Sequence, residues 1–224
     1  MNDFVGDLLC GRWVFISVKS YPQPHSLHHA FFGSKADPDK KRFEKLGLDQ
    51  MPRDSISRLF LYLIKTMPVY VLDYWKQFSG QKSVFAQSFA LHLSFVAAIS
   101  LTAFPYFWLI WLVFWWIPFL IYLPVLRFLA EAEEHRYESA FSEFDATYSN
   151  VGSFQRAFLH PHGDGFHLAH HLCPQIPHWR LSTAHMGISA MDEDFRAAMT
   201  RETFFDNPTQ PATILKNNNE LKGA

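Results

Sequence analysis

An uncharged stretch of 44 residues constrains the fold of this chain more than any other feature. Residues 83–126 contain no Asp, Glu, Lys or Arg. As a single helix the stretch would be about 66 Å long at ~1.5 Å per residue, whereas the hydrocarbon core of a bilayer is about 30 Å thick and is crossed by about 20 residues. The stretch therefore predicts two membrane spans, over about residues 84–104 and 106–126, with a turn at Pro105, because proline disfavours the helical conformation of the preceding residue.

A buried hairpin in the core of a soluble protein is the alternative to two spans. The second half of the stretch reads "YFWLIWLVFWWIPFLIYLPVL" and is apolar on all sides, and few soluble domains can cover such a helix completely. Pro118 and Pro124 are expected to kink this span, which membrane helices tolerate. The pattern favours an integral membrane protein.

Two spans return the chain to the side of the membrane that it left. The preceding segment 34–82 carries ten basic residues, and an excess of Lys and Arg beside a span favours the cytoplasmic side. Residues before Lys82 and after Arg127 are therefore expected to face the cytoplasm. Residues 56–75 are apolar but carry charges, which is typical of helices that lie in the membrane interface. Residues 4–18 are also apolar with charges inside, which fits a short re-entrant or interfacial helix.

Six of the 12 histidines form two copies of the pattern H-x-x-H-H: "HSLHH" at residues 25–29 and "HLAHH" at residues 167–171. Positions i, i+3 and i+4 share one face of a helix, and imidazole nitrogen is a ligand for iron, zinc, copper and nickel. Two such copies arise by chance in fewer than about one in a thousand chains of this composition. Histidines that cap helices explain one triplet but not two on the same side of a membrane. Six histidines exceed the four ligands of a structural zinc site, so they indicate two metal ions.

The other polar residues are weaker candidates. His92 lies within the first span, where we expect a polar packing or substrate-tunnel role rather than metal ligation. His160 and His162 precede the second triplet in a loop, without its spacing. Asp164 lies between two glycines, where a plain turn residue is the favoured interpretation over a partner of a ligand histidine.

Composition excludes other function classes. The net charge of −1 argues against a nucleic-acid-binding surface. Cys10 and Cys173 lack the CxxC spacing of a disulfide framework or a cysteine-rich zinc site.

The histidine motifs and their flanks resemble those of the membrane fatty acid desaturase superfamily. "HSLHHAFFG" (25–33) and "GDGFHLAHHLCPQIPHWRL" (163–181) look like its second and third histidine boxes, and the latter is similar to the third-box pattern H-H-L-x-P-x-x-P-x-x-x-L. The resemblance covers about residues 2–187. It also implies a role for His135 in "LRFLAEAEEHRYES", where family members often carry a lone histidine that completes the metal shell. The alternative is a charged helix turn, and we expect the glutamates around His135 to form a solvated face.

The resemblance implies an all-α integral membrane protein, with a transmembrane helical hairpin, interfacial helices and a cytosolic histidine-rich helical cap. This desaturase-like domain is expected over residues 1–205, followed by a disordered tail at 206–224. No H-x-x-x-H first box precedes His25. We therefore expect this chain to be a fragment, or to have a misassigned start, and so to lack the N-terminal part that carries the first box. The implied metal ligands are His25, His28, His29, His135, His167, His170 and His171.

The implied activity is that of a fatty acid desaturase in a bacterial inner membrane. It would use two non-haem iron ions, O₂ and electrons from a separate ferredoxin- or cytochrome-type donor to place a double bond in an acyl-lipid or acyl-CoA. A hydroxylase or other oxygenase of a lipid, alkane or carotenoid on the same scaffold is the first alternative. An inactive truncated remnant is the second, because the first box is missing.

Overall fold

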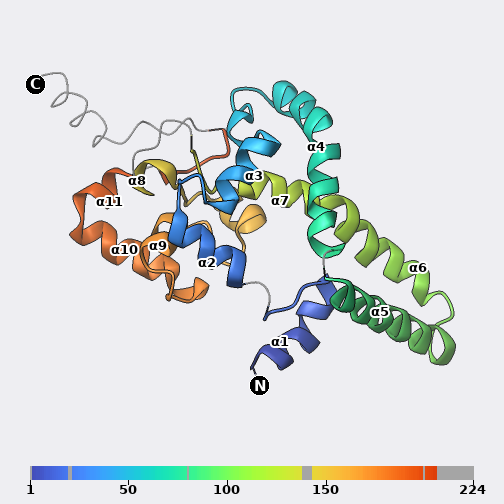
Figure 1. Cartoon of the computed structure of the whole chain (residues 1–224). Helices are drawn as coiled ribbons and strands as arrows, with labels where there is room; N and C mark the ends of the chain where they lie inside the picture. The colour runs from blue at the N-terminus through green and yellow to red at the C-terminus, as the bar shows by residue number, and fades with distance from the viewer. Residues whose placement is uncertain (1, 20–21, 80, 138–142, 199, 206–224) are drawn as a thin grey trace, which may run out of the picture. The chain divides into compact units, whose positions relative to one another are not determined.

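Helices dominate the computed structural model, which describes residues 2–19, 22–79, 81–137, 143–198 and 200–205 (Figure 1). The tail expected to be disordered at 206–224 lies outside the described residues. The chain divides into two compact units, Met1–His28 with Met67–Val125 and His29–Thr66 with Leu126–Ala224. The single desaturase-like domain expected over residues 1–205 stays a prediction.

The first unit is built around an apolar helical hairpin. Residues 103–106, which include Pro105, separate its two arms, as the sequence predicts. In Figure 1 the arms run side by side, and α5 packs against α6. The elements of this unit are α1 (Asn2–Leu9), η1 (Gly11–Val14), the start of α2 (Pro22–Phe31), the second half of α4 (Ile56–Ser79), α5 (Lys82–Thr102), α6 (Phe107–Trp111), η3 (Leu112–Trp116), η4 (Pro118–Tyr122) and the start of α7 (Leu123–Glu131).

Both arms are long and apolar enough to cross a bilayer. The arm Lys82–Thr102 has a mean hydropathy of 1.7, and the arm Phe107–Glu131, which α6, η3, η4 and α7 form together, has one of 2.2. In the apolar 18-residue window of each arm only 11% is buried inside the protein, and Leu101 and Phe114 are 85% and 75% exposed. A hairpin in a soluble core would bury these side chains, so the arms match the expected spans better than the soluble alternative.

The second arm is irregular around Pro118, whereas Pro124 lies in the regular helix α7. Its segments η3 and η4 wind as π-helix, and Pro118 opens the second of them. Proline cannot donate the helical hydrogen bond, and membrane helices accommodate it by local π adjustments. The irregularity expected at Pro118 therefore takes the form of two widened turns.

His92 ties the hairpin to η1. Its Nε2 lies 3.0 Å from the carbonyl oxygen of Trp13, and its Nδ1 accepts a hydrogen bond of 3.2 Å from Trp111 Nε1. The ring stacks on Phe15 with a centroid distance of 5.4 Å. Both nitrogens are thus used in packing, and the expectation of a packing role is confirmed.

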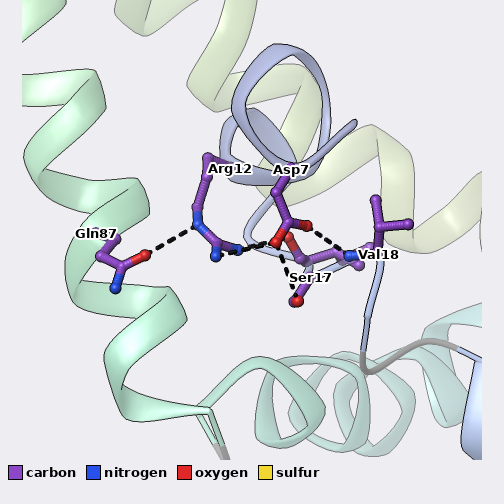
Figure 2. Close-up of polar contacts among 6 residues, drawn as sticks. Asp7, Arg12, Ser17, Val18 and Gln87 are labelled. Atoms are coloured by element: carbon purple, nitrogen blue, oxygen red, sulfur yellow. Dashed lines mark hydrogen bonds and ion pairs between the residues drawn. The ribbon is translucent and has the colours of Figure 1, made fainter. Parts of the chain in front are cut away.

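A second tie joins α1, η1 and α5 around a carboxylate (Figure 2). Asp7 accepts hydrogen bonds from the backbone N–H of Val18 at 2.6 Å and from the hydroxyl of Ser17 at 3.2 Å. Arg12 forms an ion pair with Asp7 at 3.2 Å and donates to Gln87 at 3.1 Å. The carboxylate of Asp7 therefore holds the segment after η1 against α1.

The second unit carries most of the histidines. Its strands β1 and β2 form one parallel pair of two residues each, too short to change the helical class. Its elements are the end of α2, α3 (Pro38–Leu46), η2 (Leu48–Gln50), the first half of α4, the end of α7, α8 (Glu143–Ala146), β1 (Ser149–Asn150), η5 (Gln155–Leu159), α9 (His167–Leu172), η6 (His178–Arg180), α10 (Leu181–Met191), α11 (Glu193–Ala197) and β2 (Thr200–Arg201).

The core of the second unit surrounds α9. Leu168 and Ala169 of α9 pack with Phe166, Leu181 and Phe195. Because this short helix lies inside the core, its histidines are held in a dry environment rather than on a solvated surface.

Candidate metal centre

Helix α9 presents three buried imidazoles. His167, His170 and His171 are 7%, 6% and 5% exposed. Burial, and then the neighbouring imidazoles of His135 and His171, hold the pKa of His167 well below its ordinary value. A neutral imidazole keeps a free lone pair on one ring nitrogen, and this neutral form is the one that binds a metal ion.

Histidines from two other segments meet α9 in the second unit. The Nε2 atoms of His167 and His135 are 3.0 Å apart, and those of His170 and His29 are 3.1 Å apart. The ring of His171 lies 4.4 Å from that of His29 and 4.8 Å from that of His135, measured between centroids. Five of the seven histidines that the sequence singles out are therefore close together.

The remaining two, His25 and His28, lie on the part of α2 that belongs to the first unit. Their ring centroids are 6.2 Å apart. They precede His29 on the same helix at the i, i+3, i+4 spacing, which places the three residues on one face. The expected helix over the first triplet is thus observed.

The donor set of the second unit suits a transition metal. It consists of imidazole nitrogens, which iron, zinc and copper accept. The Nε2 atoms of His167 and His135 face each other at about 3 Å, as do those of His170 and His29. In each pair only one nitrogen can donate a hydrogen bond, and the other must accept it. In addition, His167 Nδ1 is buried without a hydrogen-bond partner among the described residues, and buried polar atoms seldom lack one. The residues present therefore fit a nitrogen-ligated iron centre.

Aromatic rings enclose this cluster. Phe32 lies 5.2 Å from His135 and 4.8 Å from His171 between ring centroids, and Tyr137 lies 5.4 Å from His135. Phe43 packs beside Tyr137, with 5.1 Å between the ring centroids. The rings exclude water from the imidazoles, and no sequence pattern pointed to them.

The glutamates around His135 were expected on a solvated face, and this expectation is wrong. Glu133 is fully buried and pairs with Arg53 at 3.0 Å and Arg201 at 3.5 Å. Burial raises the pKa of Glu133, and both arginines oppose this shift. Burial and the charge of Arg201 lower the pKa of Arg53 to about 10. Glu131 is also buried and pairs with arginines, because the chain packs these carboxylates against cations from distant segments.

The remaining histidines have other surroundings. His160 is buried and pairs with Asp164, Nδ1 to Oδ2 at 3.4 Å. Asp164 is thus more than the plain turn residue that the sequence favoured, and its imidazole partner lies outside the predicted ligands. His162 is exposed. His178 stacks on His170 with a centroid distance of 5.7 Å.

Comparisons with known proteins agree with this constellation. The model of the fatty acid desaturase family matches residues 1–203. Dihydrorhizobitoxine desaturase of Bradyrhizobium elkanii is 29% identical over 178 residues, which are 70% of this chain and 49% of that protein. The chain thus spans about half the length of this relative. No solved structure matches this chain significantly.

The matched residues 1–203 include both histidine triplets and His135. Such coverage exceeds what a shared motif alone would produce, and the named relative is also a desaturase. The chain belongs to the fatty acid desaturase family.

Proposed function

We propose that this chain is a membrane-embedded desaturase that acts on a fatty acyl chain and holds two non-haem iron ions through seven histidines. The observation that carries the proposal is the convergence of five buried or half-buried imidazoles from three segments of the second unit. His25 and His28 join the set because they share the helix face of His29. The ligands are His25, His28, His29, His135, His167, His170 and His171.

The iron pair, when bound, supplies the activation of O₂ that removal of hydrogen from an unactivated C–H bond requires. In the overall reaction O₂, two electrons and two protons convert a –CH₂–CH₂– unit to –CH=CH– and yield two molecules of water. The electrons come from a separate ferredoxin- or cytochrome-type protein.

The side chains of the chain itself hold and shield the centre. Neutral, buried imidazoles offer their lone pairs without first losing a proton. Phe32 and Tyr137 keep bulk water away from His135. The buried Glu133, two residues before His135, fixes the backbone there through Arg53 and Arg201.

The apolar hairpin suits a lipid-like substrate. Its exposed aromatic and aliphatic side chains would face acyl chains in a bilayer, and the basic segment 34–82 favours a cytoplasmic histidine cluster. Acyl-lipids and acyl-CoA are both compatible with this arrangement. Because a relative is named for dihydrorhizobitoxine, that compound is included among the substrates to be tested.

Iron content tests the proposed ligands. The full chain is purified in detergent, loaded anaerobically with Fe²⁺ and assayed for bound iron by mass spectrometry of the metal. We expect about two iron ions per chain, a loss of at least half of them in His170→Ala, and no loss in His162→Ala, the matched control. An unchanged iron content in His170→Ala would contradict the proposed centre.

Product analysis tests the reaction. Membranes that contain the chain are incubated with O₂, a reduced ferredoxin and either acyl-CoA or dihydrorhizobitoxine. Desaturation predicts products lighter by two hydrogen atoms. New hydroxyl groups without new double bonds would instead identify an oxygenase on the same scaffold.

A further inference from the structure

A second group of metal-binding residue types lies in the second unit and shares no residue with the histidine set. One ligand atom from each of Glu134, His160 and Asp164 lies within 4.8 Å of the other two. Glu134 follows α7, His160 follows η5, and Asp164 lies in the turn before α9. We propose that these three residues form a further cation site, which binds one divalent transition-metal ion such as Zn²⁺ or Mn²⁺.

Buried polar atoms without partners point to a missing ligand at this cluster. His160 is only 1% exposed. Its Nε2, and the Oδ1 of Asp164, are buried without a hydrogen-bond partner among the described residues. Buried polar atoms are nearly always satisfied by protein, water or an ion. A cation held by Glu134, His160 and Asp164 would account for polar atoms that the described residues leave unsatisfied.

The charges of the cluster also favour a cation. Burial lowers the pKa of His160, but the hydrogen bond to Asp164 and the charges of Glu134, Asp164 and Glu133 outweigh it and raise this pKa. The two carboxylates therefore stabilise positive charge at the imidazole. A divalent ion placed among these side chains would be stabilised by the same charges.

The donor types select the kind of metal. One imidazole nitrogen with carboxylate oxygens suits zinc or manganese, while soft copper(I) prefers sulfur. Calcium and magnesium prefer oxygen ligands alone. Zinc holds nitrogen and oxygen ligands at about 2.0–2.2 Å, and the three ligand atoms of this cluster lie within 4.8 Å of one another.

The backbone and an open cleft support the site. Gly163 has φ +85°, and its N–H donates to the carbonyl oxygen of His160 at 3.1 Å. This turn brings Asp164 back to the imidazole of His160. His160, His162 and His178 also line an open cleft of about 860 Å³, which gives an ion a path from solvent.

Metal counting tests this site independently of the histidine centre. The full chain is purified in detergent, stripped with a chelator, loaded with Zn²⁺ and desalted. We expect His160→Gln and Asp164→Asn each to bind one Zn²⁺ fewer than the wild type. Asp194→Asn, which removes an exposed carboxylate of the same unit, should bind the wild-type number.

A second readout avoids changing the site itself. In His170→Ala, which disrupts the proposed iron centre, Zn²⁺ should still raise the melting midpoint, and adding Asp164→Asn should abolish this rise. Wild-type Zn²⁺ numbers in both His160→Gln and Asp164→Asn, or no rise in His170→Ala, would overturn the proposal. The three side chains would then be a hydrogen-bonded support of α9, with His160 protonated.

Discussion

At the scale of single residues, the buried carboxylate of Glu133 explains how charge is accommodated beside the histidines. A carboxylate without solvent is stable only when cations and donors surround it. Arg53 and Arg201 supply the cations, and Asn150 Nδ2 donates to the carbonyl oxygen of Glu133 at 2.7 Å. Arg201 also lies over the ring of Tyr148, 3.8 Å from its centroid. The segment that carries His135 is thereby fixed from several sides.

Removal of this carboxylate should be strongly destabilising. Glu133→Ala leaves two buried guanidinium groups unpaired, and breaking a buried ion pair costs about 3–5 kcal/mol. We expect a clearly lower melting midpoint in detergent, measured by far-UV circular dichroism. Arg58→Ala is the control, because its pair with Asp54 is exposed and such pairs contribute about 1 kcal/mol or less. Equal midpoints for the two variants would rule out the stabilising role.

At the scale of elements, polar ties hold the short N-terminal helices against the hairpin. Phe15 adopts the left-handed conformation with φ +61°, which is unfavourable for a bulky side chain. Its ring packs on Phe85 and Phe119 with centroid distances of 5.2 and 5.6 Å. The hydrogen bonds of Asp7 to Ser17 and Val18 hold the residues that follow. Packing and the carboxylate together offset the backbone strain.

The carboxylate of Asp7 should therefore keep η1 and the segment after it ordered. In Asp7→Ala the N–H of Val18 loses its acceptor, and we expect at least a tenfold faster amide hydrogen exchange over residues 11–19, followed by mass spectrometry. Asp3→Ala, which changes an exposed residue of α1, should leave exchange there unchanged. Similar exchange in both variants would show that the tie of Asp7 does not order the segment.

At the scale of the whole molecule, the two apolar arms decide where the chain can reside. Two arms of hydropathy 1.7 and 2.2 with few buried positions are stable only in apolar surroundings or against another apolar surface. If both cross a bilayer, their connecting turn lies on the opposite side from the segments before and after them.

This topology predicts the accessibility of single cysteines. With Cys10 and Cys173 replaced by serine, Ser34→Cys and Ser153→Cys should react with a membrane-impermeant thiol reagent only after inner-membrane vesicles expose their cytoplasmic face. Ala103→Cys, in the turn between the arms, should react only from the other face. Labelling of all three positions from one face would contradict a membrane-spanning hairpin.

Local patterns made part of this protein predictable from its sequence. The uncharged run and Pro105 predict two apolar helices and their turn, because length and charge along the chain set what a bilayer can accept. The spacing of each histidine triplet predicts a shared helix face, because helical periodicity is a local property. The residue types at His25, His28 and His29 likewise indicate a metal before any contact is known.

Only the tertiary structure decided which distant residues meet. It brought His135 to His167, buried Glu133 between Arg53 and Arg201, and joined Glu134 to His160 and Asp164. The expectation that the glutamates are solvated failed for the same reason. Burial and long-range proximity arise from how the core packs around α9, and that packing depends on all of its contacts together rather than on the order of residues in any one segment.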